Sequence, residues 1–326
     1  MSDEDRQEAE GAPCDQAPKL TLPIRQLSLS TLHPDHLELW VTDQAGHLWH
    51  SWYWTSTGWQ PWHEMEVPGS VGAFAAGETT ELRQDLFVAT DEDVQHRHCI
   101  LEGSDSTEGT PPPPERNATW SPWQPFKKFP GGRIEQLGLA TTGKHHLEAW
   151  AIDQAGGLWN SWLVDPDDWS EWSKFKTPGR VLSTAAGCRV DGHQDLFIAT
   201  DDGISTCRHE SRWGPWWDFQ PQLDGRRVTR LGVSRLTAGH LELWALDGGG
   251  SLWHCWSRHQ DEWQPWKQFD TPSPVVTFVA GQRADHRQEL VVATDTGLYL
   301  SSYLADGEAT RWEPWEGLPT ASSEPG

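Results

Sequence analysis

Trp59-Gln-Pro-Trp62 is the first of six copies of an aromatic-x-x-aromatic element that decide the fold of this chain. The later copies follow at intervals of 44 to 61 residues and read Trp120-Ser-Pro-Trp123, Trp169-Ser-Glu-Trp172, Trp213-Gly-Pro-Trp216, Trp263-Gln-Pro-Trp266 and Trp312-Glu-Pro-Trp315. An Asp that ends a β-rich run recurs with them, at Asp43, Asp91, Asp153, Asp201, Asp247 and Asp295. Repetition at a period near 50 residues indicates one supersecondary unit per repeat, stacked on its neighbours.

The first repeat shows what each unit contains. Four runs, at residues 24–31, 36–42, 47–54 and about 59–66, carry alternating, β-branched or aromatic residues and are separated by Gly, Pro or Asp. No helical periodicity of useful length is present. The sequence therefore predicts an all-β fold, a six-bladed β-propeller of four-stranded antiparallel blades. A solenoid of stacked β-arches is the alternative, but neither end of the chain carries a capping repeat.

We expect a single propeller domain over residues 20–320, with repeats at approximately 22–68, 69–131, 132–179, 180–225, 226–272 and 273–320. Residues 1–19 are polar and acidic and are expected to form a disordered tail, and residues 321–326 a second, short tail. The second repeat has a long interruption at residues 102–118 that contains Pro111-Pro-Pro-Pro114. It falls between the third and fourth strands and is predicted to be a mobile surface loop.

Composition narrows the possible partners and compartment. The formal net charge is −23, which disfavours binding to phosphate backbones or anionic lipid. No apolar run approaches the length of a membrane span, so no membrane insertion is expected. The N-terminus lacks the basic and apolar regions of a secretory signal, and the five Cys residues form no C-x-x-C pair. These features favour the cytoplasm, from which release would need a non-classical route.

Three of the recurrent Asp residues open a turn whose fourth residue is Gly. They occur in Asp43-Gln-Ala-Gly46, Asp153-Gln-Ala-Gly156 and Asp247-Gly-Gly-Gly250. An Asp side chain hydrogen-bonds the turn backbone, and Gly accepts a positive φ. A role in turn formation is therefore favoured over metal binding or catalysis.

Odd and even repeats differ in their middle strands. Odd repeats carry His36-Leu-Glu-Leu-Trp40, His146-Leu-Glu-Ala-Trp150 and His240-Leu-Glu-Leu-Trp244, followed by Leu48-Trp-His-Ser-Trp52, Leu158-Trp-Asn-Ser-Trp162 and Leu252-Trp-His-Cys-Trp256. Even repeats read Gln84-Asp-Leu-Phe-Val-Ala-Thr-Asp91, Gln194-Asp-Leu-Phe-Ile-Ala-Thr-Asp201 and Gln288-Glu-Leu-Val-Val-Ala-Thr-Asp295 and lack the paired Trp residues. This alternation suggests that the odd repeats carry a function, although a duplicated ancestor also accounts for it.

If Asp43 and Gly46 close the hairpin, the two strands pair so that Trp40 lies opposite Trp49 and Glu38 opposite Ser51. Because side chains alternate across a strand, each odd blade then presents Trp rings, a carboxylate and an imidazole on one face. The predicted carbohydrate-binding residues are His36, Glu38, Trp40, Trp49, His146, Glu148, Trp150, Trp159, His240, Glu242, Trp244 and Trp253. An aromatic platform with directed polar groups suits a neutral sugar.

Two alternatives to this site stay open. In the first, Glu38 and its counterparts pair with an Arg between blades and the Trp residues only fill space. In the second, a one-residue shift of register exchanges the faces. The site would then contain Trp52, Trp162 and Trp256 with His50, Asn160 and His254.

The run Leu-Glu-Leu-Trp…Asp-x-x-Gly-x-Leu-Trp-His-x-Trp…Trp-x-x-Trp resembles the repeat of the Photorhabdus-lectin-like (PLL-like) family over about residues 22–319. That resemblance implies a β-propeller lectin that binds fucose or O-methylated sugars in pockets between blades. This chain has six units where the family typically has seven, and is similar in plan to the six-bladed fungal fucose-binding lectins.

The function expected from the sequence is a multivalent carbohydrate-binding lectin, tryptophan-rich and repetitive, whose partners are glycoconjugates. It needs no cofactor and no metal, and an oligomer is compatible with it. No motif of a hydrolase, metalloprotease or nucleotide-binding enzyme is present, so we expect no enzyme activity. The alternative is a propeller that serves as a protein-interaction scaffold and binds no sugar.

Overall fold

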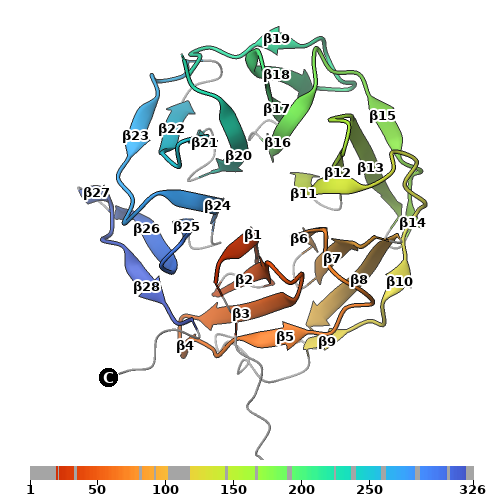
Figure 1. Cartoon of the computed structure of the whole chain (residues 1–326), viewed down its shortest axis with the longest axis vertical. Coiled ribbons are helices and arrows are strands. Elements are labelled where there is room, and N and C mark those ends of the chain that lie inside the picture. Colours follow the sequence, from red (N-terminus) through yellow and green to blue (C-terminus); the bar gives the residue numbers. More distant parts are fainter. Residues whose placement is uncertain are drawn as a thin grey trace, which may run out of the picture.

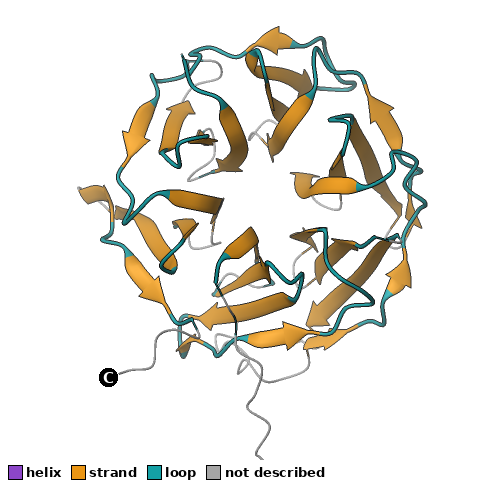
Figure 2. Cartoon of the chain, viewed as in Figure 1, coloured by secondary structure: helices purple, strands orange, loops and turns teal. Residues whose placement is uncertain are grey.

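The computed structural model describes residues 20, 22–32, 35–80, 83–91, 93–101, 118–143, 146–165, 168–188, 193–223, 225–235, 240–257, 262–282, 287–306 and 309–320. Within these residues the strands form six antiparallel sheets, arranged radially as the blades of a propeller (Figure 1). The same ranges contain strands, turns and loops but no helix (Figure 2), and hence no helix long and apolar enough to cross a membrane. The predicted six-bladed β-propeller is confirmed.

Each odd blade is built from one repeat. The first comprises β1 (Ile24–Ser30), β2 (His36–Asp43), β3 (Leu48–Trp54), β4 (Gly58–Trp59) and β5 (His63–Met65). The third comprises β11 (Ile134–Gly143), β12 (His146–Asp153), β13 (Leu158–Asp165), β14 (Asp168–Trp169) and β15 (Ser173–Phe175). The fifth comprises β20 (Val228–Ser234), β21 (Leu241–Asp247), β22 (Leu252–Ser257) and β23 (Lys267–Phe269).

The even blades alternate with them. The second comprises β6 (Ala73–Thr80), β7 (Arg83–Ala89), β8 (Val94–Leu101), β9 (Ala118–Trp120) and β10 (Gln124–Pro125). The fourth comprises β16 (Val181–Cys188), β17 (Gln194–Thr200), β18 (Gly203–His209) and β19 (Trp217–Asp218). The sixth comprises β24 (Val275–Gln282), β25 (Gln288–Thr294), β26 (Leu298–Asp306), β27 (Ala309–Trp312) and β28 (Glu316–Leu318).

The fourth strand of a blade is broken at its Trp-x-x-Trp element. In the first blade the sequence predicts one strand over residues 59–66, but β4 and β5 both pair with β3 and are separated by Gln60, Pro61 and Trp62. Proline has no N–H to donate to a neighbouring strand. Three predicted features lie outside the described residues: the acidic tail at 1–19, all but the last residue of the loop predicted at 102–118, and the short tail at 321–326.

The second Trp of each Trp-x-x-Trp element fastens one blade to the preceding one. Its indole N–H donates to a backbone carbonyl of that blade, at 2.5 to 3.1 Å, in all six copies, which lie within the described residues. The pairs are Trp62 with Pro319, Trp123 with Glu66, Trp172 with Lys127, Trp216 with Lys176, Trp266 with Pro221, and Trp315 with Asp270. The bond from Trp62 to Pro319 joins the first blade to the last and so helps to close the ring.

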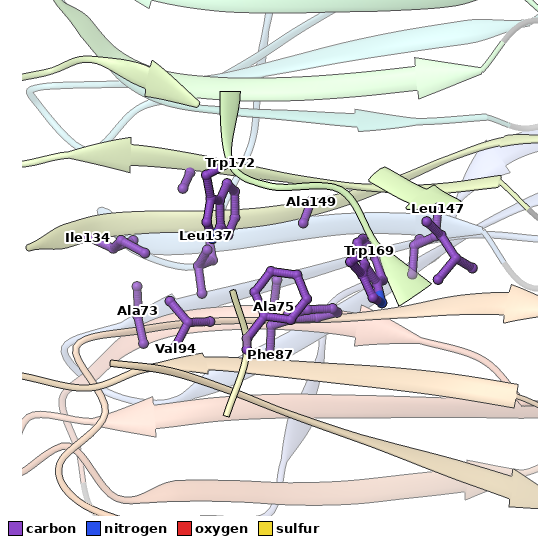
Figure 3. Packing of buried hydrophobic residues seen from close by; sticks show 14 residues of the cluster. Ala73, Ala75, Phe87, Val94, Ile134, Leu137, Leu147, Ala149, Trp169 and Trp172 are labelled. Carbon is purple, nitrogen blue, oxygen red and sulfur yellow. The ribbon is translucent and has the colours of Figure 1, made fainter. Parts of the chain in front are cut away.

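The core lies between the blades, so both faces of every sheet are covered. The described residues form six hydrophobic clusters, each shared by two adjacent blades. Figure 3 shows one of them, in which Phe87 of the second blade contacts Trp169 of the third with ring centroids 4.9 Å apart. Edge-to-face packing of this kind stabilises the contact beyond the area that it buries.

Candidate functional site

The hairpin between β2 and β3 has a different register from the predicted one. Trp40 pairs with His50, and Glu38 pairs with Trp52, so the predicted pairs Trp40–Trp49 and Glu38–Ser51 are wrong. The third and fifth blades have the same register, in which Glu148 pairs with Trp162 and Glu242 with Trp256. This is the one-residue shift that the sequence left open as an alternative.

The cause of the shift lies in the turn. The N–H of Asp43 donates to the carbonyl of His47 at 3.2 Å, so Asp43 and His47 close the hairpin and the loop has one residue more than predicted. Gly46 has a φ of +84° and occupies the last loop position. A three-residue hairpin loop that ends in a left-handed Gly has this geometry. The extra residue moves every side chain of the third strand to the other face.

The predicted turn role of the Asp residues is confirmed in the odd blades. Asp43 Oδ1 accepts a hydrogen bond from the N–H of His47 at 2.9 Å. Asp153 and Asp247 each accept two backbone N–H groups of their own turns, at 2.7 to 2.9 Å. The same carboxylates also accept the indole N–H of Trp49, Trp159 and Trp253, at 3.4, 2.8 and 3.1 Å respectively. These three Trp rings are therefore anchored by the turn.

Because of the register, Trp49 and Trp40 lie on opposite faces of the first blade. Trp49 is 2% exposed and packs with Leu39, Val291 and Ala293 against the sixth blade. Trp40 is fully buried against the second blade, where its ring meets Trp120 edge to face at 5.5 Å. The predicted grouping of these two rings on one face is therefore wrong, and neither offers an open platform.

A buried polar network lies on the face of the first blade that meets the second. Glu38 Oε1 is bonded to His50 Nδ1 at 2.6 Å, and the His50 ring stacks on Trp40 at 4.7 Å. Trp40 donates its indole N–H to Ser30 Oγ at 3.0 Å. Gln84 of the second blade also bonds to Ser30 and to Glu38. This network joins an odd blade to the next even one through its carboxylate.

Charge and hydrogen bonding hold Glu38 in its ionised form. Burial raises its pKa, but the hydrogen bond and the charge of His50, the charge of His36 and the hydrogen bond of Gln84 together outweigh burial, so the pKa of Glu38 is lowered from its ordinary value. The carboxylate is 3% exposed. A buried carboxylate with such partners is a strong hydrogen-bond acceptor.

The network recurs in the fifth blade and is altered in the third. Glu242 is bonded to His254 and accepts from Gln288 of the sixth blade at 2.5 Å. In the third blade Asn160 replaces the His and donates to Glu148 Oε1 at 2.7 Å. Burial raises the pKa of Glu148 to about 7, although the bond from Asn160 lowers it. The pKa values of Glu38 and Glu148 are therefore shifted in opposite directions, although the two residues occupy equivalent positions.

Sequence reasoning missed the Gln residues that reach these networks. Gln84 and Gln288 are at most 1% exposed, and they are the second residue of β7 and the first residue of β25 respectively. The available signal was the Gln-acid-Leu sequence that begins all three even motifs. It identifies the even blades, but a sequence pattern alone does not show that its first residue reaches the carboxylate of the preceding blade.

The indole rings that reach the surface beside these carboxylates belong to Trp52, Trp162 and Trp256. Trp162 is 38% exposed, and the other two are half-buried. Trp52 stacks on His63 with centroids 5.0 Å apart, and the Lys267 ammonium lies 4.8 Å from the ring of Trp256. Each ring is directly opposite a Glu in the strand pairing, where Cβ atoms are about 5 Å apart.

The remaining predicted residues have other surroundings. His36 is 4% exposed and accepts the Leu32 N–H through Nδ1 at 3.2 Å. His240 is half-buried immediately before β21, and the side chain of His146 lies outside the described residues. The assignment of the predicted set to sugar binding stays a prediction. In the described ranges, no three His, Cys, Asp or Glu side chains gather as a metal site.

No family model and no curated protein sequence matches this chain. Solved structures do match it. AofleA from Arthrobotrys oligospora is 12% identical, with a TM-score of 0.64 over 90% of this chain and 86% of that one. The BP39L lectin from Burkholderia pseudomallei is 14% identical, with a TM-score of 0.62 over 91% and 86% of the two chains.

A third match is the Aleuria aurantia lectin, described as having a six-bladed β-propeller fold and a novel fucose recognition mode. It is 10% identical, with a TM-score of 0.61 over 93% of this chain and all of that one. At such identities the likeness establishes the fold alone, a six-bladed β-propeller, and the specific resemblance to the PLL-like family stays a prediction.

Proposed function

We propose that this protein is a multivalent lectin that binds neutral sugars at the three interfaces where an odd blade meets the next even blade. The observation that carries the proposal is the cross-strand pair of a buried Glu and a surface-reaching Trp. The pair recurs as Glu38–Trp52, Glu148–Trp162 and Glu242–Trp256. The likeness in fold to proteins described as fucose-binding lectins supports the same conclusion.

The chemistry of the pair suits a pyranose ring. The apolar C–H face of a sugar packs on an indole plane, while its hydroxyl groups require directed donors and acceptors. In the first blade His50 is 13% exposed at its side chain and links the buried Glu38 to the surface, with its ring 5.4 Å from Trp52. The Glu38 carboxylate polarises the His50 ring, which strengthens a hydrogen bond between His50 and a sugar hydroxyl. Fucose or O-methylated sugars fit best, because they present extended apolar faces.

Three related sites on one ring provide multivalency. Individual monosaccharide sites are weak, but simultaneous engagement of a glycan-coated surface raises avidity by about 10² to 10⁴ where the geometry permits it. The targets are therefore glycoconjugates that display many copies of one sugar.

A glycan array with fucosylated and O-methylated sugars tests the function, followed by calorimetric titration of the best monosaccharide. We expect Trp52→Ala, Trp162→Ala and Trp256→Ala each to remove about one third of the binding stoichiometry. Val276→Ala, a truncation at a residue that is 43% exposed on β24, is the control and should leave the titration unchanged. Unchanged stoichiometry in all three Trp variants would refute the sites. A folded protein that binds no glycan would instead support an interaction scaffold.

A further inference from the structure

A cleft of about 180 Å³ lies between the fourth and fifth blades, on the face of β17 and β18 opposite to the one that meets the third blade. Its walls include Asp195, Thr206, Arg208 and Trp217 of the fourth blade and Trp263 of the fifth. None of these residues belongs to the Glu–Trp pairs. The cleft occurs where an even blade meets the next odd one, so it is separate from the three proposed sites.

The size of residue 206 explains the cleft. In β18 Thr206 pairs with Phe197, and the same register position holds His96 in the second blade and Leu300 in the sixth. His96 fills its interface by bonding to Asp85 at 2.8 Å and stacking on Phe87 at 4.4 Å. Leu300 packs in the cluster between the sixth and first blades. Thr206 is smaller than either residue and leaves the volume open.

The floor of the cleft is polar. Arg208 donates through Nε to Asp195 Oδ1 at 2.8 Å, and Asp195 is 2% exposed. Thr206 is 4% exposed, and its Oγ1 has no hydrogen-bond partner among the described residues. A buried hydroxyl without a partner costs free energy, which a bound ligand would recover by accepting from it or donating to it.

Two indole rings line the remaining walls. Trp217 is 42% exposed, and the Arg208 guanidinium lies 6.0 Å from its ring. Trp263 is half-buried and is fixed by edge-to-face contacts with Phe219 at 4.9 Å and Phe197 at 5.7 Å. The cleft therefore combines a rigid aromatic wall, an accessible aromatic wall and a charge-neutral floor.

We propose that this cleft is a fourth carbohydrate site, which takes one neutral monosaccharide residue. Its volume is below the range of about 300 to 1,000 Å³ that drug-sized ligands need, so it holds a single ring. Asp195 and Arg208 neutralise each other, which removes the preference for a charged ligand. Hydroxyl groups of the sugar bond Thr206 and the Asp195–Arg208 pair, and its apolar face packs on Trp217. The proposal extends the proposed lectin function to a different type of interface.

Thr206→Leu is the sharpest test, because it copies the residue that the sixth blade carries at this position. The full-length protein and this variant are titrated with methyl α-L-fucoside, methyl β-D-galactoside and methyl α-D-mannoside. Crystals soaked with the same sugars locate each bound ring. We expect Thr206→Leu to weaken binding at the cleft at least tenfold and to remove the ring there. Trp217→Ala provides a second variant that leaves the floor intact and should also weaken this site.

The possible results separate this inference from the proposed function. Sugar at the Glu–Trp pairs but never in the cleft overturns the fourth site and leaves the lectin proposal standing. Sugar in the cleft alone, lost in Thr206→Leu, supports the fourth site and refutes the other three. If Thr206→Leu leaves sugar binding in the cleft unchanged, Thr206 does not contribute to the site, and the assignment of the cleft floor is overturned. Absence of all three sugars from both places overturns both proposals.

Discussion

Trp40 donates its indole N–H to Ser30 Oγ at 3.0 Å, and in the fifth blade Trp244 makes the same bond to Ser234 at 2.9 Å. In the third blade the Ser is replaced by Ala140, which pairs with Glu148 as Ser30 pairs with Glu38. The Nε1 of Trp150 consequently has no hydrogen-bond partner among the described residues. A buried donor without a partner destabilises the fold by about 1 to 3 kcal/mol.

Ala140→Ser should therefore stabilise the protein. The new hydroxyl supplies the acceptor that Trp150 lacks, and we expect the free energy of unfolding to rise by about 1 kcal/mol. Urea denaturation followed by circular dichroism measures this change in unfolding free energy. Ser234→Ala is the matched control and should lower the unfolding free energy by about 1 to 3 kcal/mol, because it creates the same defect in the fifth blade. A loss of stability in Ala140→Ser would contradict this explanation.

The carboxyl group of Glu148 should make stability depend on pH. Burial raises its pKa to about 7 in the folded state from an ordinary value of 4.5, so folding takes up a proton between these pH values. Its contribution to stability is present below pH 4.5 and is lost as pH rises through 7, by up to about 3 kcal/mol. Glu148→Gln should remove this loss and be more stabilising at pH 8 than at pH 5, as measured by urea denaturation at both values.

Glu38→Gln is expected to behave in the opposite way. Burial raises the pKa of Glu38, but its polar partners, His50 foremost with His36 and Gln84, together lower it overall, so this carboxylate stabilises the fold when it is ionised. That contribution is lost as pH falls through the lowered pKa. The substitution should therefore destabilise the protein at pH 7, and the difference from the unsubstituted protein should shrink in acid. Equal pH profiles for Glu38→Gln and Glu148→Gln would contradict the role of His50.

Gly46→Ala should be more damaging than Gly58→Ala. Both Gly residues have a positive φ, +84° and +73°, where an Ala is strained by about 1 kcal/mol. A Cβ at Gly46 would also meet the backbone of Val71 at 3.2 Å, whereas one at Gly58 meets nothing within 4 Å. We expect Gly58→Ala to cost about 1 kcal/mol and Gly46→Ala clearly more, as read from thermal unfolding. A smaller loss for Gly46→Ala would contradict the described turn.

Trp62→Phe tests the closure of the ring. It keeps an aromatic ring but removes the bond to the Pro319 carbonyl at 2.5 Å, so we expect a loss of about 1 kcal/mol in unfolding free energy. Trp216→Phe removes the equivalent bond to Lys176 between the third and fourth blades and should cost a similar amount. Chemical denaturation compares the two variants. If Trp216→Phe lowers the unfolding free energy but Trp62→Phe does not, the bond from Trp62 to Pro319 does not contribute to closure of the ring.

The pattern along the chain was sufficient to predict the propeller. The Trp-x-x-Trp elements and the Asp turns recur once per blade, and alternation with turn residues marks the strands. The break in the fourth strand was not predicted: in the first blade the sequence suggested one continuous run over residues 59–66, although Pro61 lies within it. These features are local, because they depend on backbone conformation at a few consecutive residues.

The composition of the site was predicted less well. Glu38 and its counterparts are indeed buried beside polar partners, but the partners include Gln84 and Gln288 from the next blade. The cleft at Thr206 was not predicted from the sequence. It forms because Thr206 is smaller than His96 and Leu300, which occupy the same register position in other blades. Contacts between blades join residues more than 40 positions apart, and no local pattern specifies them.

The sequence by itself determined the number of repeats, the strands of each blade and the Asp–Gly turns within them. Only the tertiary structure decided which face of an odd blade carries which Trp. In most half-buried strands the apolar face fixes the register, but here both faces are covered by neighbouring blades and both carry aromatic residues. The hydrophobic pattern is therefore compatible with either register, and the left-handed conformation of Gly46 selects the one that places Trp52 beside Glu38.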